Sequence, residues 1–232
     1  MSAQKEKGGM IEYPRNGGKV SAFLARPGGA GPFPALIVVQ EWWGLNAHIK
    51  DVAGRFAGEG YVALAPDLYH GKVTDDPSEA GKLMGALNRE EAVKALLAGI
   101  AYLKGLQGVD GSRLGVTGYC MGGSYALLLP CRTKEIKAAA PYYGEVPDEA
   151  TLKSLACPVL YIYGDADFWI TREDVRRLEG ALKKFGKPGE VKIYPGAPHA
   201  FFNDTRKDVY RAREAEDAWR RTLDFFAKHL KA

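Results

Sequence analysis

The stretch RLGVTGYCMGGSYALLL, from Arg113 to Leu129, decides the fold. Its first residues, Arg113–Thr117, have the apolar character of a short buried strand, and Met121–Leu129 follows as a helix. Between the two, Gly118 and Gly122 stand on either side of Cys120. Glycine there lets the chain turn sharply without a side-chain clash, and the positive end of the following helix favours a thiolate. The stretch therefore predicts a strand, a tight turn with a nucleophilic cysteine, and a helix. The alternative is a small buried cysteine in an ordinary turn.

Strands and helices alternate along the rest of the chain. This alternation predicts an α/β fold, with a mostly parallel sheet covered by helices on both faces. We expect one domain over residues 1–232, with a flexible N-terminus over residues 1–10. The expected strands are Ala35–Gln40, Tyr61–Ala65, Arg113–Thr117, Ile136–Tyr142, Val159–Tyr163 and Glu190–Tyr194. The expected helices are Ile49–Glu59, Glu90–Leu106, Met121–Leu129, Arg172 to about Phe185 with a capping box from Thr171 and Asp174, and Asp208–Leu230.

Composition excludes several classes of function. The chain is 46% hydrophobic and 26% charged, and its net charge of +4 is spread without a basic run, so nucleic acid is not an expected partner. No signal-peptide core or run long enough to span a bilayer occurs, so no membrane partner is expected. An odd set of cysteines, Cys120, Cys131 and Cys157, favours a reducing compartment. We expect a cytoplasmic monomer or homodimer, with no metal and no cofactor.

A thiol nucleophile needs a base, and four histidines are candidates. His48 and His70 lie early in the chain, and His229 lies near the end of the terminal helix. Only His199 follows a late strand, in the loop Pro195–Phe201, which two prolines and a glycine stiffen. Because a lone loop histidine is more often structural, His199 gains weight only from its position after the cysteine and after an acid.

The acid is expected at the end of the strand Val159–Tyr163. Asp165 and Asp167 both follow that strand, and either can instead be a turn aspartate that caps the next helix. We favour Asp167 as the acid and Asp165 as the residue that shapes the turn. The resulting order of nucleophile, acid and histidine is the order found in α/β-hydrolases.

Several short landmarks carry a resemblance to the dienelactone hydrolase family, over most of the chain from about Lys19 to Leu230. The landmarks are Gln40-Glu41-Trp42-Trp43-Gly44-Leu45-Asn46, Pro66-Asp67-Leu68-Tyr69, Gly118-Tyr119-Cys120-Met121-Gly122-Gly123, Tyr142-Tyr143-Gly144, Gly164-x-x-Asp167 and His199-x-Phe201. The resemblance implies a single α/β-hydrolase domain and a triad of Cys120, His199 and Asp167. It further implies that Glu41 controls the reactivity of the thiol. The oxyanion hole is then formed by the backbone N–H groups of Trp42 and Met121.

The chain departs from the family pattern where the substrate is held. Members that act on dienelactone use two arginines for the substrate carboxylate, one in the segment after Pro-Asp-Leu-Tyr and one four residues after the catalytic histidine. Here the segment His70–Leu87 has only Lys72 and Lys82 as cations, and the second position is Asn203. Without this bidentate clamp, we expect a neutral or aromatic ester. The expected substrate-binding residues are Trp43, Tyr142, Trp169, Phe201, Phe202 and Asn203, with core packing as the alternative for each aromatic.

The sequence thus predicts a cysteine-dependent hydrolase of small-molecule esters or lactones that works through a covalent intermediate. A first alternative is a promiscuous aryl esterase and phosphotriesterase that acts on neutral aromatic substrates. A thioesterase or peptidase on the same scaffold is a further alternative. A non-catalytic ligand-binding protein that retains the hydrolase fold is the alternative from another class.

Overall fold

The computed structural model describes residues 7–231, which form eight strands and seven helices. The α/β class with mostly parallel strands is confirmed. Contacts divide the chain after Gly115 into two compact units, and each is described by itself. The strands are β1 (Lys7–Arg15), β2 (Gly18–Arg26), β3 (Phe33–Val39), β4 (Val62–Pro66), β5 (Val109–Tyr119), β6 (Ile136–Tyr142), β7 (Val159–Ala166) and β8 (Gly189–Pro198). The helices are α1 (Ala47–Gly58), α2 (Pro77–Ala86), α3 (Arg89–Gly105), α4 (Met121–Arg132), α5 (Glu149–Leu152), α6 (Arg172–Lys184) and α7 (Ala212–Leu230).

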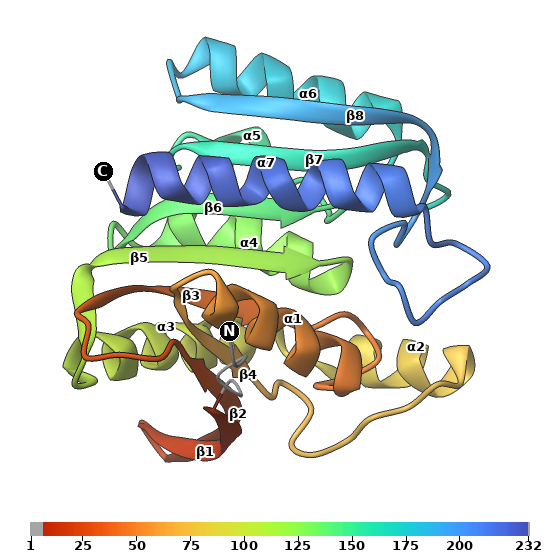
Figure 1. The fold of residues 1–232 in the computed structure, drawn as a ribbon. Coiled ribbons are helices and arrows are strands. Elements are labelled where there is room, and N and C mark those ends of the chain that lie inside the picture. The colour runs from red at the N-terminus through yellow and green to blue at the C-terminus, as the bar shows by residue number, and fades with distance from the viewer. Residues whose placement is uncertain (1–6, 232) are drawn as a thin grey trace. The chain divides into compact units, whose positions relative to one another are not determined.

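The first unit contains a four-stranded sheet in the order β1-β2-β4-β3. β3 and β4 are parallel and buried along nearly their whole length, as expected for strands covered on both faces. β2 pairs antiparallel with both β1 and β4. α1 packs on one face of these strands and α3 on the other (Figure 1). The tyrosine of β1, Tyr13, joins the two layers by donating a hydrogen bond to the Ala95 carbonyl of α3 at 2.9 Å.

The second unit begins within β5 and contains the parallel strands β6, β7 and β8, which pair in that order. α7 lies across β6 and β7 on one face, and α4 and α6 lie on the other face (Figure 1). Because all three strands run the same way, their carboxyl ends reach one edge of this sheet. Polar residues that follow β7 and β8 are thereby brought together.

The expected elements recur with shifted ends. β6 has the predicted bounds, and the capping box of Thr171 and Asp174 at the start of α6 is confirmed. β8 extends to Pro198 instead of Tyr194, and α7 begins at Ala212 instead of Asp208. β1, β2, α2 and α5 were not expected. Residues 7–10 of the stretch expected to be flexible belong to β1, and residues 1–6 lie outside the described part.

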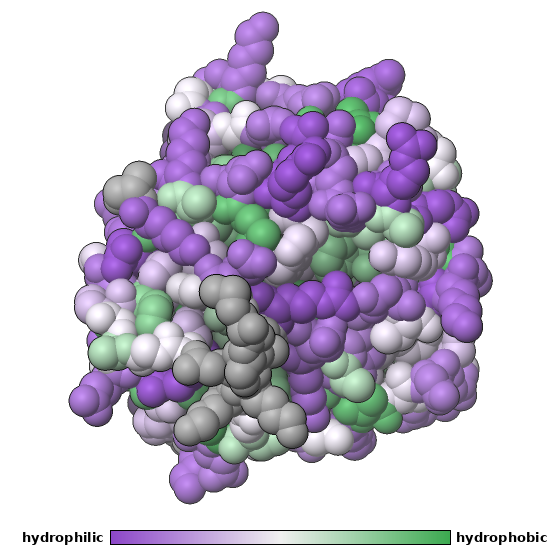
Figure 2. Space-filling model, in the orientation of Figure 1, coloured by the Kyte–Doolittle hydropathy of each residue, from purple (hydrophilic) through white to green (hydrophobic). Residues whose placement is uncertain are grey.

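The surface is mainly polar on the face that Figure 2 shows, where hydrophobic residues form small separate patches. Among the described residues, only three large hydrophobic residues are exposed: Met10 and Val73, each 53% exposed, and Phe168, which is 85% exposed. Two of them lie in the first unit. Phe168 lies in the second unit, directly after Asp167, which makes its exposure relevant to the site described next.

Candidate active site

Cys120 stands between the end of β5 and the first residue of α4. Its backbone has φ 57° and ψ −121°, a conformation that side chains with a Cβ rarely adopt. Two hydrogen bonds hold it there: its N–H donates to the Tyr142 carbonyl at 3.2 Å, and its carbonyl accepts from the Ser124 N–H at 3.2 Å. Strain of this kind is retained only where the surroundings enforce it, and it is typical of functional positions.

The turn is enforced by close backbone packing between α4 and the segment after β6. A Cβ on Gly123 would lie 2.2 Å from the Tyr142 carbonyl oxygen, and a Cβ on Gly144 would lie 2.1 Å from the Gly123 carbonyl carbon. Both glycines are therefore required by space. The predicted need for glycine at Gly118 and Gly122 stays a prediction.

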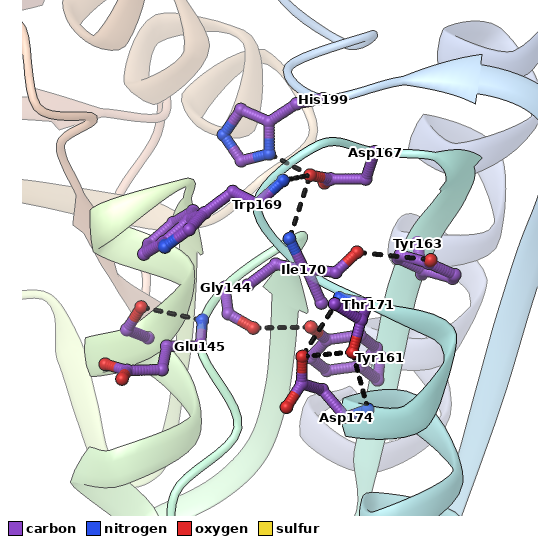
Figure 3. A network of polar contacts seen from close by, with 11 residues as sticks. Gly144, Glu145, Tyr161, Tyr163, Asp167, Trp169, Ile170, Thr171, Asp174 and His199 are labelled. Carbon is purple, nitrogen blue, oxygen red and sulfur yellow. Dashed lines mark hydrogen bonds and ion pairs between the residues drawn. The ribbon is translucent and has the colours of Figure 1, made fainter.

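Asp167 and His199 meet at the carboxyl ends of β7 and β8 (Figure 3). Asp167 Oδ2 lies 2.7 Å from His199 Nδ1, and the two side chains are 0% and 8% exposed. Asp167 Oδ1 accepts from the backbone N–H groups of Trp169 at 2.7 Å and Ile170 at 3.0 Å. A carboxylate held in this way fixes the imidazole with its proton on Nδ1 and leaves Nε2 as an acceptor.

His199 Nε2 is buried and has no hydrogen-bond partner among residues 7–231. The imidazole instead lies within an aromatic frame. Its ring centroid is 5.0 Å from that of Tyr143, 5.4 Å from that of Phe168 and 5.5 Å from that of Trp169, all in edge-on arrangements. The arrangement presents a basic nitrogen in a largely apolar setting, ready to take a proton from a ligand or a neighbouring group.

Of the two candidate aspartates, Asp167 is the one bonded to the histidine. Asp165 accepts a hydrogen bond from the Gly196 N–H at 2.6 Å, and so ties the end of β7 to β8. This is the turn-shaping contact expected of it. Directly after His199, Ala200 has a left-handed backbone with φ 60°. The Ala200 carbonyl accepts from the Asn203 N–H at 2.9 Å, so hydrogen bonds hold the loop that carries the imidazole on both sides.

The residues expected to bind substrate are mostly buried. Tyr142 is 0% exposed, and its hydroxyl donates to the Ala218 carbonyl at 3.1 Å and lies 2.7 Å from Thr222 Oγ1, both on α7. Phe201 and Phe202 are buried in the core. Among the expected residues of the second unit, only Trp169 is partly exposed beside His199.

Asn203 stands where the family pattern has an arginine. Its side chain is 1% exposed, and Oδ1 accepts from the Thr205 N–H at 3.1 Å and hydroxyl at 2.6 Å. The side chain therefore shapes the turn after His199. It brings no cation to that position.

Glu41, Trp42 and Trp43 lie in the first unit, just after β3. Glu41 is 1% exposed, and the two indoles meet edge to face with centroids 4.8 Å apart. The Trp43 carbonyl accepts from the Thr74 N–H at 3.1 Å, which anchors this loop. Their roles in controlling the thiol, stabilising an oxyanion and binding substrate stay predictions.

Two residues near the imidazole were not expected from the sequence. Tyr143 has a left-handed backbone with φ 37° and packs on His199. Phe168 packs on the same ring and is exposed. The sequence could have indicated Phe168 as a site residue, because it is a large apolar residue that directly follows the predicted acid. Tyr143 lacked one, because its contact with His199 depends on a turn that only the tertiary structure reveals.

Residues 7–231 contain no group of three or more His, Cys, Asp or Glu side chains arranged to hold a metal ion. Within the same range, none of the helices combines the length and apolar character needed to cross a membrane. The oligomeric state and the cellular location stay predictions.

Comparison with known proteins places this geometry in context. The model of the dienelactone hydrolase family matches residues 20–230. "Protein usf" from Aquifex pyrophilus is 37% identical over 96% of this chain and 99% of that protein. A candidate carboxymethylenebutenolidase from Aquifex aeolicus is 34% identical, covering 97% of this chain and 100% of its own length.

Solved structures with a similar fold include members of the same family. The crystal structure of a candidate dienelactone hydrolase from Klebsiella pneumoniae has a TM-score of 0.90 and 32% identity, over 97% of this chain and 100% of that one. A dienelactone hydrolase-like promiscuous phosphotriesterase from metagenomic libraries has a TM-score of 0.89 over 97% of this chain and 98% of that one. At 21% identity, this second likeness establishes the fold alone.

Proposed function

The chain belongs to the dienelactone hydrolase family, and from this premise we propose that it cleaves small-molecule esters or lactones with Cys120 as nucleophile. A hydrolase acting on ester or lactone bonds is what the family supports. The proposal adds the residues: His199 as the base and Asp167 as the acid that orients it.

The backbone of Cys120 is the observation that carries the proposal. A cysteine that served only to fill the core would gain nothing from a left-handed conformation, which is unfavourable for any residue with a Cβ. The same residue is the N-cap of α4, where the positive end of the helix dipole lies. A nucleophile that develops negative charge is stabilised there.

The proposed catalytic cycle assigns one role to each of these residues. Nε2 of His199 takes the thiol proton, and the sulfur of Cys120 bonds to the acyl carbon of the substrate. The Met121 N–H donates to the oxygen that becomes negative, and a donor of this kind stabilises the transition state by about 3 kcal/mol. The alcohol departs with the proton from Nε2. Water then loses a proton to Nε2 and attacks the thioester carbon. The C–S bond breaks, the acyl group leaves as the carboxylic acid, and Nε2 returns the proton to the sulfur. Trp42 N–H is the second oxyanion donor that the sequence predicts.

His199 Nε2 has no hydrogen-bond partner among the described residues, so this nitrogen is available to accept a proton. Catalytic hydrogen bonds often tighten only when substrate binds. We infer that the pair of Cys120 and His199 forms in the complex. Asp167 keeps the imidazole in the required tautomer in both states.

The other two cysteines are poor alternatives as nucleophiles. Burial raises the pKa of the Cys131 thiol to about 11 and that of the Cys157 thiol to about 12. Cys131 Sγ also lies 3.5 Å from the Leu127 carbonyl within α4. Thiols with such raised pKa values remain protonated at neutral pH and react slowly.

Alkylation and substitution test the proposal together. Iodoacetamide should abolish hydrolysis of p-nitrophenyl acetate, and Cys120→Ala should abolish it without alkylation. Cys131→Ala, the matched control, should keep the rate and remain sensitive to iodoacetamide. Full activity in Cys120→Ala would refute the assignment of the nucleophile. A folded protein that hydrolyses no ester would favour the non-catalytic ligand-binding alternative.

A second candidate activity is cleavage of neutral aryl phosphotriesters. Asn203 supplies no cation where the family pattern has an arginine, which favours a neutral substrate over a carboxylate. A soft thiolate beside oxyanion donors is suited to attack activated phosphorus esters as well. Release of p-nitrophenol from an aryl dialkyl phosphate, lost in Cys120→Ala, is the expected result. No turnover by enzyme that still cleaves aryl acetates would exclude this activity.

A further inference from the structure

Phe168 is exposed in a position that the fold does not require. It is 85% exposed, although it directly follows Asp167, whose side chain is 0% exposed, and precedes the buried Ile170 by two residues. Exposing a phenyl ring to water is unfavourable, and monomeric proteins place such rings singly at their surface without consequence. Phe168 differs from such single cases because one side of its ring contacts His199.

The loop that carries Phe168 is anchored on both sides. Asp167 Oδ1 accepts from the backbone N–H groups of Trp169 and Ile170. The Ile170 carbonyl accepts from the Tyr163 hydroxyl at 3.2 Å, and the capping box of α6 begins at the next residue (Figure 3). The backbone on both sides of Phe168 is therefore held by hydrogen bonds, and its exposure is not that of a free loop tip.

Two aromatic rings of this loop flank the imidazole. Phe168 meets it at a centroid distance of 5.4 Å and an interplanar angle of 64°, and Trp169 meets it at 5.5 Å and 75°. Both side chains are accessible, Phe168 over most of its surface and Trp169 in part. Figure 3 shows Trp169 and His199 on the same side of the loop. A planar ring bound beside His199 would thus lie near two accessible aromatic side chains, and aromatic rings attract one another in edge-on or offset arrangements.

We propose that Phe168 and Trp169 form an aromatic clamp that holds an aryl group of the substrate beside His199 and makes the enzyme selective for neutral aryl esters. The clamp rests on the proposed function, since it orients the ester that Cys120 attacks. Asn203, with its amide oxygen occupied by Thr205, adds no cation for an anionic substrate. Phe168 is a specificity-determining residue in this account, and His199 remains the base.

Two activated acetyl esters separate the clamp from the chemistry. p-Nitrophenyl acetate carries a ring, and S-ethyl thioacetate carries none. Phe168→Ala should lower kcat/KM for p-nitrophenyl acetate about 10-fold, mainly through KM, as expected for loss of one aromatic contact. The same variant should change kcat/KM for the thioester less than about 2-fold, because no ring is lost from that complex. Phe168→Tyr should restore aryl selectivity, and Phe168→Leu should restore it only in part.

Met10→Ala is the matched control, because it removes another exposed apolar side chain and should change neither rate. Thermal unfolding checks that Phe168→Ala is folded, as its exposure leads us to expect. An equal fall for both esters, or no fall for either, would overturn the clamp and leave the proposed function intact. If the unsubstituted protein hydrolyses neither ester, the proposed function fails. Calorimetric binding of acetophenone, a neutral aryl ketone, then tests the clamp: affinity unchanged by Phe168→Ala would overturn it.

Discussion

Replacing Asp167 by asparagine separates the orientation of the imidazole from the shape of the loop. Asparagine keeps Oδ1, so the backbone N–H groups of Trp169 and Ile170 retain their acceptor. The group that faces His199 Nδ1 becomes an N–H₂, which drives the histidine proton to Nε2. An imidazole protonated there cannot take the thiol proton of Cys120.

The expected fall in kcat follows from the hydrogen bond that Asp167→Asn removes. Asp167 Oδ2 and His199 Nδ1 lie 2.7 Å apart, with side chains 0% and 8% exposed. A charge-assisted hydrogen bond between such buried groups contributes about 2–3 kcal/mol. Together with the tautomer change, we expect kcat to fall by about 10²–10³-fold, or about 3–4 kcal/mol.

The assay is hydrolysis of p-nitrophenyl acetate under saturating conditions, with thermal unfolding as a check on the fold. Asp165→Asn is the matched control, because its carboxylate bonds to Gly196 and should leave kcat within a few-fold. Asp167→Asn with more than a tenth of the normal kcat would show that Asp167 does not orient the base.

Three further predictions concern the framework of the site. Asp217, whose pKa is lowered to about 2 chiefly by the hydrogen bond from Arg221, should stabilise the fold by about 2 kcal/mol above pH 5. Because the pKa of Asp217 is lower in the folded than in the unfolded chain, this contribution falls to about 1 kcal/mol at pH 3. Urea unfolding measures the difference in free energy of unfolding between the unsubstituted protein and Asp217→Asn, and a difference that does not change with pH would contradict the prediction. Gly144→Ala should lower both Tm and activity, since its Cβ would overlap the Gly123 backbone, whereas Gly180→Ala, which meets nothing within 4 Å, should lower neither. Tyr142→Phe should lower the free energy of unfolding in urea by about 1–2 kcal/mol, because the hydrogen bonds of its hydroxyl to α7 are lost, and should leave KM unchanged. A raised KM with unchanged stability would instead assign Tyr142 to substrate binding.

The sequence predicts the strands that are buried on both faces. β6 has its predicted bounds because its sequence, IKAAAPY, is apolar apart from Lys137 and follows the charged pair Lys134 and Glu135. β1 was missed because its sequence, KGGMIEYPR, contains two glycines and a proline, which weaken any strand signal. It exists through its pairing with β2, a tertiary contact that local patterns do not contain.

The candidate site was predictable to the level of residue type and order. Asp167 and His199 were chosen because each follows a late strand, and the parallel pairing of β7 and β8 brings them to hydrogen-bonding distance. The hydrogen bonds of the Tyr142 hydroxyl to α7 were not predictable, because its partners Ala218 and Thr222 lie far along the chain. The same holds for Tyr143, whose left-handed turn is set by packing. Sequence identifies the groups that follow each strand, and the packing between elements decides which of them contact the imidazole.

Detection of the acyl-enzyme tests the central claim most directly. The protein is mixed rapidly with p-nitrophenyl acetate, quenched in acid, digested and analysed by mass spectrometry. We predict one acetyl group per chain on the peptide that contains Cys120, with none on the peptides of Cys131 and Cys157, whose pKa values burial raises to about 11 and about 12. The adduct should accumulate in His199→Ala if acylation still proceeds there, and no adduct should form in Cys120→Ala. Turnover with no acetyl group on Cys120 at any quench time, and undiminished in Cys120→Ala, would contradict the account.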